Sequence, residues 1–351
     1  MLKKRETLGV SVVAVLASTT LVFAFSSSSA SGASTSSATP AGQLVVYSNS
    51  GKQFIKPVLA AFAKAYPKIQ MQYNDVEDPV SFARYRAERA QGARTADVII
   101  ASSPSLWVQN KNIGLNWTPS DTSAYPSFRV QFPGVFVLSP DPAVSIYSKV
   151  KLPANRVANT YAQLASFAKQ YPSLFNKKLV TYTANNFFGY SAFWGYVQKH
   201  GWSVFRTLAP MTKAAPDGVV MGQQIATGAS NYGYFESGLI RGALTPVQRK
   251  LIGWLYMRDF TPLISRGIAV TKGGSNPTAA EAFVNWLYST SGQKSLCAAG
   301  FTAFRTGVNC ANSLSSVERA VGASHVYLVP YNNNIAQDRS AFVQHWHQLF
   351  G

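Results

Sequence analysis

The stretch LVVYSNSGKQFIKPVLAAFAKAYPKIQMQY, residues 44–73, decides the fold of this chain. It opens with four apolar residues, a run that is typical of a buried strand. A polar turn follows at residues 48–51, and apolar side chains then recur at helical spacing until Pro67 ends the helix. The alternating residues 69–73 predict a second strand. Strand, helix and strand in this order form a βαβ unit, so we expect the two strands to pair in parallel.

The polar turn of this unit consists of Ser48, Asn49, Ser50 and Gly51 and lies at the start of the predicted helix. Free backbone N–H groups and the positive end of the helix dipole point into such a turn, which therefore suits an anion or a polar group of a ligand. The alternative interpretation is that Ser48 or Ser50 only caps the helix.

Two later turns occupy the same position after a predicted strand. The buried strand at residues 96–100 leads to Ser102 and Ser103, and the strand at residues 178–182 leads to a polar and aromatic turn at residues 183–190. In open α/β sheets, ligands bind beside the turns that follow the carboxyl ends of parallel strands. These turns are therefore the candidate binding site.

The rest of the chain continues the α/β pattern. Strands are predicted at residues 135–138 and 143–147, and a second α/β unit begins near Lys149. Residues 277–289 predict a strongly amphipathic helix, and residues 338–350 predict a helix of aromatic and basic side chains. The 351 residues exceed the usual size of one domain and can bury a large core.

The N-terminus has the pattern of an export signal. Basic residues at positions 3–5 precede an uncharged, mostly apolar run at residues 8–25, and residues rich in Ser, Ala, Gly and Thr follow. We predict a signal at residues 1–33 and a Ser-rich linker at residues 34–42. The alternative is an uncleaved membrane anchor, because the apolar run is close to the shortest length that spans a bilayer. Either reading places the protein outside the cytoplasm, in the periplasm or at the cell surface.

The chain has two cysteines, Cys297 and Cys310. In an exported protein an even pair most simply forms a disulfide, and two free buried thiols are the alternative.

The formal net charge is +18. A basic exported protein can contact an acidic envelope or attract an anionic ligand at long range. After the signal, Lys and Arg are scattered with no run longer than two residues, so the pattern argues against a nucleic-acid partner.

The usual signatures of enzymes are absent from the sequence. It contains no HExxH, GxSxG, GxxxxGK[ST] or GxGxxG motif and no zinc-type cluster of Cys and His. His345 and His347 are two residues apart on a predicted helix, so they do not share a face. We therefore expect a protein without catalytic residues and without a cofactor.

Four stretches together resemble the periplasmic-type substrate-binding proteins of ABC importers, in particular the group of ferric-iron, phosphonate and sugar-phosphate binders. They are LVVYSNSG with KAYPKIQMQY in residues 44–73, RAERAQGARTADVIIAS at 86–102, NPTAAEAFVNWLYSTSGQ at 276–293 and RSAFVQHWHQLFG at 339–351. The third stretch is the most specific. The residues that fit the family's pattern there are Pro277, Ala280, Phe283, Trp286, Leu287, Ser289, Gly292 and Gln293.

The resemblance implies a type II periplasmic-binding-protein fold, with two α/β lobes, each a mixed sheet flanked by helices, joined by two crossover strands. Lobe one would comprise residues 43–144 and 268–351, and lobe two residues 145–267. A small solute would bind between the lobes, and the closed form would dock on a membrane permease. The implied partners are thus a solute and permease subunits, and the chain is expected to act as a monomer.

The resemblance also implies the ligand-binding residues. Carried over by position, they are Ser48, Asn49, Ser50, Gly51, Ser102, Ser103, Thr183, Asn185, Gly189, Tyr190 and Tyr232. Ser, Thr and Asn side chains beside helix N-termini suit an oxyanion such as a phosphate, phosphonate or carboxylate. Asp78, in the loop before the next helix, could serve an amine or a metal, or could only cap that helix.

Ferric iron is the alternative solute, with Tyr232 and Tyr234 as its metal ligands. The sequence departs from the ferric-binding pattern, because Gly233 separates the two tyrosines and Asn49-Ser50 stands where an Arg-His pair often occurs. Fe³⁺ prefers phenolate and carboxylate oxygens, and the departures favour an anionic organic solute. A further alternative is an envelope adhesion module that transports no small molecule.

Overall fold

The βαβ unit predicted at the start of the chain is confirmed. The strand β1 (Gly42–Ser48), the helix α1 (Lys52–Ala65) and the strand β2 (Ile69–Asp75) follow one another, and β1 pairs with β2 in parallel along its whole length. The helix is amphipathic, and it buries Ile55, Val58 and Phe62 in the main hydrophobic core.

The computed structural model describes residues 39–351. The predicted export signal at residues 1–33 lies outside the described residues, as does most of the predicted linker at residues 34–42. Within the described residues, no helix is both long enough and apolar enough to cross a bilayer.

Eleven strands of the described chain form one continuous sheet in the order β2-β1-β3-β10-β5-β8-β6-β7, with β4 and β9 beside β5 and β11 beside β10. The strands not yet given are β3 (Val98–Ala101), β4 (Val130–Phe132), β5 (Val135–Ser148), β6 (Leu179–Tyr182), β7 (Thr212–Ala215), β8 (Tyr232–Ser237), β9 (Ile252–Leu255), β10 (Thr261–Val270) and β11 (Val326–Leu328).

Two groups of parallel strands lie within this sheet. In the first group, β1 pairs in parallel with both β2 and β3. In the second group, β6 pairs in parallel with both β7 and β8. Parallel pairing requires crossover connections, and helices supply them in both groups.

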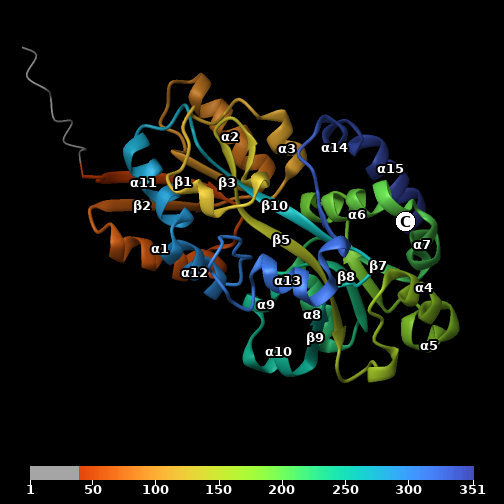
Figure 1. The fold of residues 1–351 in the computed structure, drawn as a ribbon. Helices are drawn as coiled ribbons and strands as arrows, with labels where there is room; N and C mark the ends of the chain where they lie inside the picture. The colour runs from red at the N-terminus through yellow and green to blue at the C-terminus, as the bar shows by residue number, and fades with distance from the viewer. Residues whose placement is uncertain (1–38) are drawn as a thin grey trace, which may run out of the picture. The chain divides into compact units, whose positions relative to one another are not determined.

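The long strands β5 and β10 connect the two groups, as Figure 1 shows. They pair with each other in antiparallel fashion between residues 136–142 of β5 and 263–268 of β10. The far half of β10 pairs with β3 of the first group, whereas the far half of β5 pairs with β8 of the second. The sequence predicted β5 as two strands, and the structure corrects this to one strand of 14 residues.

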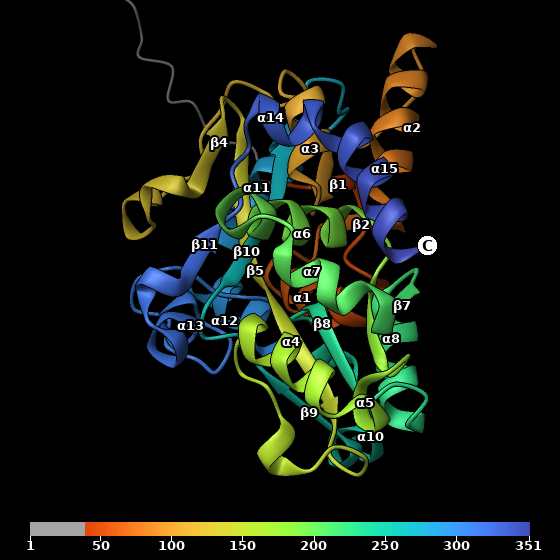
Figure 2. The ribbon, with the colours of Figure 1, turned by 90° about the vertical axis from the view of Figure 1, so that its right-hand side faces the viewer.

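Helices flank both groups of strands (Figures 1 and 2). They are α2 (Asp78–Ala90), α3 (Pro104–Gln109), α4 (Tyr161–Gln170), α5 (Pro172–Phe175), α6 (Phe187–His200), α7 (Ser203–Leu208), α8 (Gly218–Thr227), α9 (Ile240–Ala243), α10 (Pro246–Leu251), α11 (Pro277–Tyr288), α12 (Thr290–Ala298), α13 (Leu314–Val321), α14 (Asn333–Gln337) and α15 (Arg339–Phe350). Short 3-10 turns occupy Thr122–Ala124, Ser127–Arg129, Ala154–Arg156, Ala209–Met211 and Ala323–His325.

The most specific sequence stretch, at residues 276–293, forms α11 and the start of α12. Phe62 of α1 packs against two aromatic side chains of α11, with ring centroids 4.8 Å from Phe283 and 5.5 Å from Trp286. The apolar spacing of this stretch therefore reflects the core that joins α11 to the first βαβ unit.

The C-terminal helices lie against α6. The Tyr190 hydroxyl of α6 donates to the Ile335 carbonyl at 2.6 Å, and the Trp194 indole N–H donates to Asp338 at 2.9 Å. The division implied by the resemblance puts residues 268–351 in lobe one and α6 in lobe two. These contacts place α14 and Asp338, the residue before α15, beside α6, and the division into lobes stays a prediction.

The predicted disulfide is confirmed, because the structure joins Cys297 of α12 to Cys310. The bond closes a loop with a sequence separation of 13 residues. Buried Ala303 and Val308 pack beside it in a small apolar cluster.

Replacing both cysteines by serine is expected to lower the free energy of unfolding by about 3 kcal/mol, because the unfolded chain regains the entropy that the closed loop removed. Urea unfolding of wild type and of C297S/C310S, each with and without a reductant, measures this. The reductant should bring wild type to the level of the variant and leave the variant unchanged. A wild-type protein that does not respond to the reductant would contradict the prediction.

Candidate functional site

A cavity of about 340 Å³ lies where strands of both groups end. Its wall includes residues that end or directly follow β1, β2 and β3 of the first group, and β6, β7 and β8 of the second. Crevices at the carboxyl ends of parallel strands are the usual binding places of open α/β sheets. Here six such strand ends serve one cavity.

Three helices of ten or more residues begin at this cavity. They are α1, α6 and α8, and the residues at their first turns line the wall, among them Gly51, Asn186 and Gly218. Each helix start presents N–H groups without partners inside the helix and the positive end of the helix dipole. The cavity can therefore hold a negatively charged group of a ligand beside these helix starts.

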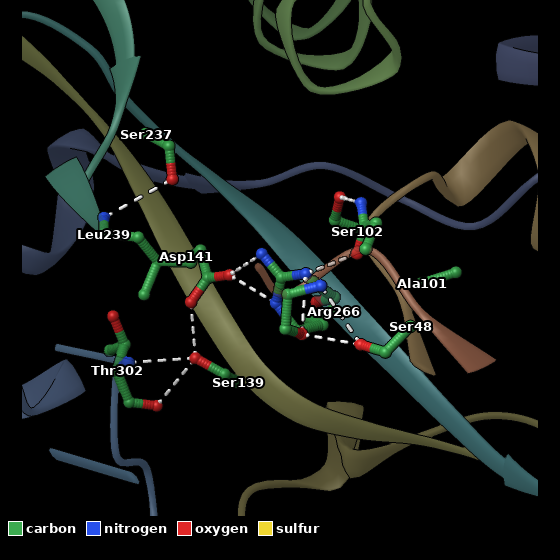
Figure 3. A network of polar contacts seen from close by, with 12 residues as sticks. Ser48, Ala101, Ser102, Ser139, Asp141, Ser237, Leu239, Arg266 and Thr302 are labelled. Atoms are coloured by element: carbon green, nitrogen blue, oxygen red, sulfur yellow. Dashed lines mark hydrogen bonds and ion pairs between the residues drawn. The ribbon is translucent and has the colours of Figure 1, made fainter. Parts of the chain in front are cut away.

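Arg266 of β10 holds the polar turns of the first group together (Figure 3). Its Nη1 donates to the Asn49 side-chain oxygen at 2.6 Å and to the Ser50 hydroxyl at 3.3 Å. The Asn49 amide in turn donates to the Ser102 hydroxyl at 2.7 Å. The turns after β1 and β3 are thus fixed by one side chain from a connecting strand.

The guanidinium of Arg266 is itself anchored by Asp141 of β5, with both Nε and Nη2 3.0 Å from Asp141 Oδ2. The Asp141 carboxylate also accepts a hydrogen bond from Ser139, whose hydroxyl accepts from the Thr302 backbone N–H. Only 3% of Arg266 and 1% of Asp141 are exposed, so the ion pair is fully buried. The geometry of the site therefore depends on the two strands that connect the two groups.

Asp78 fixes the backbone of the turn at Ser102 through a hydrogen bond. Its Oδ2 accepts from the Ser102 backbone N–H at 3.0 Å, and its Oδ1 has no hydrogen-bond partner. Burial raises the pKa of Asp78 to about 7, and the positive charge of Arg266 opposes this rise. Of the two roles considered for Asp78, neither the ligand nor the simple cap describes this contact, which positions Ser102.

Glu236, near the end of β8, is a further buried acid of the site, with 1% of its surface exposed. Its Oε1 accepts from the Tyr182 hydroxyl at 2.7 Å and from the Ser237 backbone N–H at 2.8 Å. Its Oε2 has no hydrogen-bond partner. Burial raises the pKa of Glu236 to about 8, and the hydrogen bond from Tyr182 opposes this rise.

A β-bulge directs Glu236 toward the cavity. The register between β5 and β8 shifts between Val144 and Ile146, and Phe235 adopts a positive φ of 61° there. A bulge re-aims the side chains beside it, and a bulky residue in this backbone region is a strained exception. The strain at Phe235 is consistent with a binding site next to it.

The structure brings the predicted first-group residues together at the cavity. Asn49, Ser50, Gly51 and Ser102 line its wall. Ser48 is buried behind them, where its hydroxyl donates to the Ser50 hydroxyl at 2.9 Å. Ser103 does not line the wall, because it is the N-cap of α3 and its hydroxyl accepts from the Leu106 backbone N–H.

The predicted turn after β6 reaches the cavity through neighbours of the residues carried over from the family. Tyr182, Asn186 and Phe188 line the wall. Of the residues carried over, Thr183 and Asn185 lie in the turn, Asn185 exposed, and Gly189 and Tyr190 are buried in the first turn of α6. The structure does not bring Thr183, Asn185, Gly189 or Tyr190 into the wall of the cavity.

The two tyrosines considered as iron ligands are core residues. Tyr232 and Tyr234 are both fully buried, and neither lines the cavity. The Tyr232 hydroxyl donates to the Ala158 carbonyl at 2.7 Å, and the Tyr234 hydroxyl shares a hydrogen bond of 3.1 Å with Thr212. Within residues 39–351, no group of three or more His, Cys, Asp or Glu side chains is arranged to hold a metal ion.

The variant Tyr232→Phe is expected to lose about 1 kcal/mol of stability, because the buried Ala158 carbonyl loses its donor. Its affinity for any solute that binds the cavity should equal that of wild type within about twofold. Urea unfolding and calorimetric titration measure the two quantities. A large loss of affinity with unchanged stability would instead make Tyr232 a ligand.

Sequence reasoning missed Arg266 and Glu236, the two charged residues at the centre of the site. Each is a single charged residue within an otherwise apolar strand, LISRGIAV for Arg266 and YGYFES for Glu236. A charge inside a buried strand is costly unless it is paired, so each was a signal that could have been followed.

Comparisons with known proteins place the chain by its fold. Neither a comparison with models of protein families nor a search of curated proteins finds a match. Among solved structures, a substrate binding protein of an ABC transporter from Agrobacterium tumefaciens is similar with a TM-score of 0.79. It is 21% identical, and the match covers 89% of this chain and 97% of that one.

Two further solved structures have named ligands. Iron-bound HitA from Pseudomonas aeruginosa has a TM-score of 0.70 at 14% identity, over 88% of this chain and 99% of that one. The periplasmic binding protein AfuA from Actinobacillus pleuropneumoniae, with fructose-6-phosphate bound, has a TM-score of 0.68 at 14% identity, over 88% and 98%. All three are binding proteins, and the chain has the two-lobed α/β fold of type II periplasmic binding proteins that was predicted from its sequence.

Proposed function

We propose that this protein is the extracytoplasmic solute-binding component of an ABC importer. It binds a small solute with at least one anionic group in the cavity and delivers it to membrane permease subunits. The observation that carries this proposal is the convergence of six strand ends and three helix starts on one cavity, tied together by buried Arg266. The fold, shared with substrate-binding proteins of ABC transporters, supports it.

The anionic group lies beside the turns of the first group. Asn49, Ser50 and Ser102 supply amide and hydroxyl groups there, and the start of α1 adds the positive end of its helix dipole. These are the donors that phosphate, phosphonate and carboxylate groups accept from. A cavity of about 340 Å³ suits a small organic molecule. Recognition alone explains these residues, so no catalytic step is proposed.

Ferric iron is a second candidate because oxygen ligands reach the cavity wall from both groups of strands. Asp75 and Glu77 follow β2, and Asp217 follows β7. Carboxylate oxygens are ligands that Fe³⁺ prefers. In this alternative the carboxylates would have to come together when iron binds, because within residues 39–351 no group of three or more such side chains is arranged to hold a metal ion.

A thermal-shift screen of the purified protein tests the proposal. The panel holds inorganic phosphate, sugar phosphates, phosphonates, dicarboxylates, amino acids, polyamines, thiamine, free Fe³⁺ and ferric citrate. A solute at a hundred times its dissociation constant adds about 2.7 kcal/mol of stability. We expect at least one anionic organic compound to raise the melting temperature of wild type, and to raise that of Asn49→Ala much less. Stabilisation by iron alone would favour the second candidate.

A further inference from the structure

The wall of the cavity is acidic although the chain is basic. The whole chain has 32 Lys and Arg against 14 Asp and Glu. The cavity reverses this ratio, since its wall contains one basic residue, Arg266, and four acidic residues, Asp75, Glu77, Asp217 and Glu236. The charge of Arg266 is already balanced by Asp141. A ligand with anionic groups alone would therefore face the negative charges of Asp75, Glu77 and Asp217 and the buried carboxyl group of Glu236.

Helix capping accounts for part of this acidity. Asp75 Oδ2 accepts from the Lys52 backbone N–H at 2.7 Å at the start of α1, and Asp217 Oδ1 accepts from the Val220 backbone N–H at 2.8 Å at the start of α8. Acidic side chains at helix N-termini are ordinary. Glu77 occupies the N-cap position of α2, but its side chain makes no capping hydrogen bond. Glu236 lies in a strand, so capping hydrogen bonds do not account for these two carboxylates.

Glu236 points to a ligand most directly. Only 1% of its surface is exposed, it lines the cavity, and its Oε2 has no hydrogen-bond partner. Burying an unpaired carboxylate oxygen is costly, and a positively charged donor from a ligand would remove the cost. Gly218 makes room for this carboxylate, because a Cβ there would lie 2.3 Å from Glu236 Oε1.

Acidic residues from the two groups of strands also repel one another electrostatically. Desolvation and the carboxylates of Asp75 and Asp217 raise the pKa of Glu77. Glu77 and Asp75 follow β2 of the first group, whereas Asp217 follows β7 of the second. A cation in the cavity would relieve repulsion between the two groups.

We propose that the solute carries an ammonium group as well as an anionic group, and that Glu236 binds the ammonium while the polar turns ordered by Arg266 hold the anion. This inference rests on the proposed function. It narrows the solute to amino-substituted phosphonates, phosphates or carboxylates.

An ammonium group fits these residues better than a metal ion does. The phenol nearest to Glu236 is Tyr182, and its hydroxyl is engaged as a donor to Glu236. Burial and the Glu236 carboxylate raise the pKa of Tyr182 further, so it resists becoming the tyrosinate that Fe³⁺ prefers. An ammonium group has three donors, and one of them can bond the free Oε2 of Glu236.

Calorimetric titration of the purified protein with matched pairs of compounds tests the inference. The pairs are aminoethylphosphonate and ethylphosphonate, β-alanine and propionate, and γ-aminobutyrate and butyrate, with inorganic phosphate, fructose phosphate and ferric citrate as further probes. We expect the amino compound of the best-binding pair to bind at least about tenfold more tightly than its partner, because a hydrogen bond to a buried charge is worth that much.

The variant Glu236→Gln should reduce this preference about tenfold or more, and Glu77→Gln, at an exposed position of the wall, should reduce it less. They should leave the affinity of the compound without the amino group within about threefold. Glu318→Gln, the same substitution on α13 outside the cavity, is the matched control and should change neither affinity.

The outcomes separate the inference from the proposed function. Equal or tighter binding of the compound without the amino group, or of phosphate or fructose phosphate, would overturn the inference and keep the proposed function. Binding of ferric citrate alone would overturn the inference and favour the second candidate. No binding by any compound would contradict the proposed function, and the inference with it.

Discussion

Replacing Arg266 by methionine is expected to destabilise the protein by about 3–5 kcal/mol and to abolish solute binding. The substitution leaves the Asp141 carboxylate buried without its ion-pair partner, and breaking a buried pair from one side costs this much. It also removes the donor that orders Asn49 and Ser50. Urea unfolding measures the first effect, and calorimetric titration measures the second.

The double variant R266M/D141N separates the two effects. It removes the unpaired charge and leaves an amide oxygen for the Ser139 hydroxyl, so most of the lost stability should return. Solute binding should stay absent, because the turns after β1 and β3 remain without Arg266. A single variant that loses less than about 1 kcal/mol, or a double variant that binds solute normally, would contradict the role assigned to Arg266.

Glu236→Gln is expected to stabilise the solute-free protein at high pH and to change it little at low pH. The pKa of Glu236 rises from 4.5 to about 8 on folding, so the folded protein keeps a proton that the unfolded chain releases between these values. Wild-type stability therefore falls as pH rises through this window, and the whole loss is present above pH 8. Glutamine never ionises, so the variant should gain roughly 3–5 kcal/mol at pH 9.

Urea unfolding of both proteins at pH 5 and pH 9 checks this result. Asp78 also has a raised pKa, but it titrates in both proteins and cancels in the difference. Glu318→Gln provides the comparison for loss of a negative charge elsewhere. A gain in stability of the same size at pH 5 and pH 9 would contradict the prediction, because it would mean that ionisation of Glu236 does not destabilise the folded protein.

Local sequence patterns predicted most of the elements that build the fold. The βαβ unit at residues 44–73 needs only an apolar run, a helical period and a proline stop, and all three act locally. Pro140 and Pro142 lie between the two strands predicted at residues 135–138 and 143–147, and proline is usually excluded from a central strand. These prolines lie two residues apart, so both lack an N–H group on the same edge of β5. Within residues 39–351, β10 alone pairs with β5 at these positions.

The site was less predictable because its central contacts join distant parts of the chain. The polar turns could be found from their place after each strand. Arg266, however, reaches Asn49 across 217 residues and Asp141 across 125 residues, through the register of two long strands. The bulge at Phe235 that aims Glu236 is equally invisible in the sequence, because nothing in YGYFES requires a positive φ.

The most direct test of the binding site is calorimetric titration of two matched tryptophan variants with the strongest stabilising compound of the screen. Val219 lines the cavity near the start of α8 and is 48% exposed, whereas Val247 lies near the start of α10, outside the cavity, and is 67% exposed. We predict that Val219→Trp fills the cavity and abolishes binding, and that Val247→Trp binds like wild type. Equal binding by the two variants would contradict the proposal that the solute occupies this cavity.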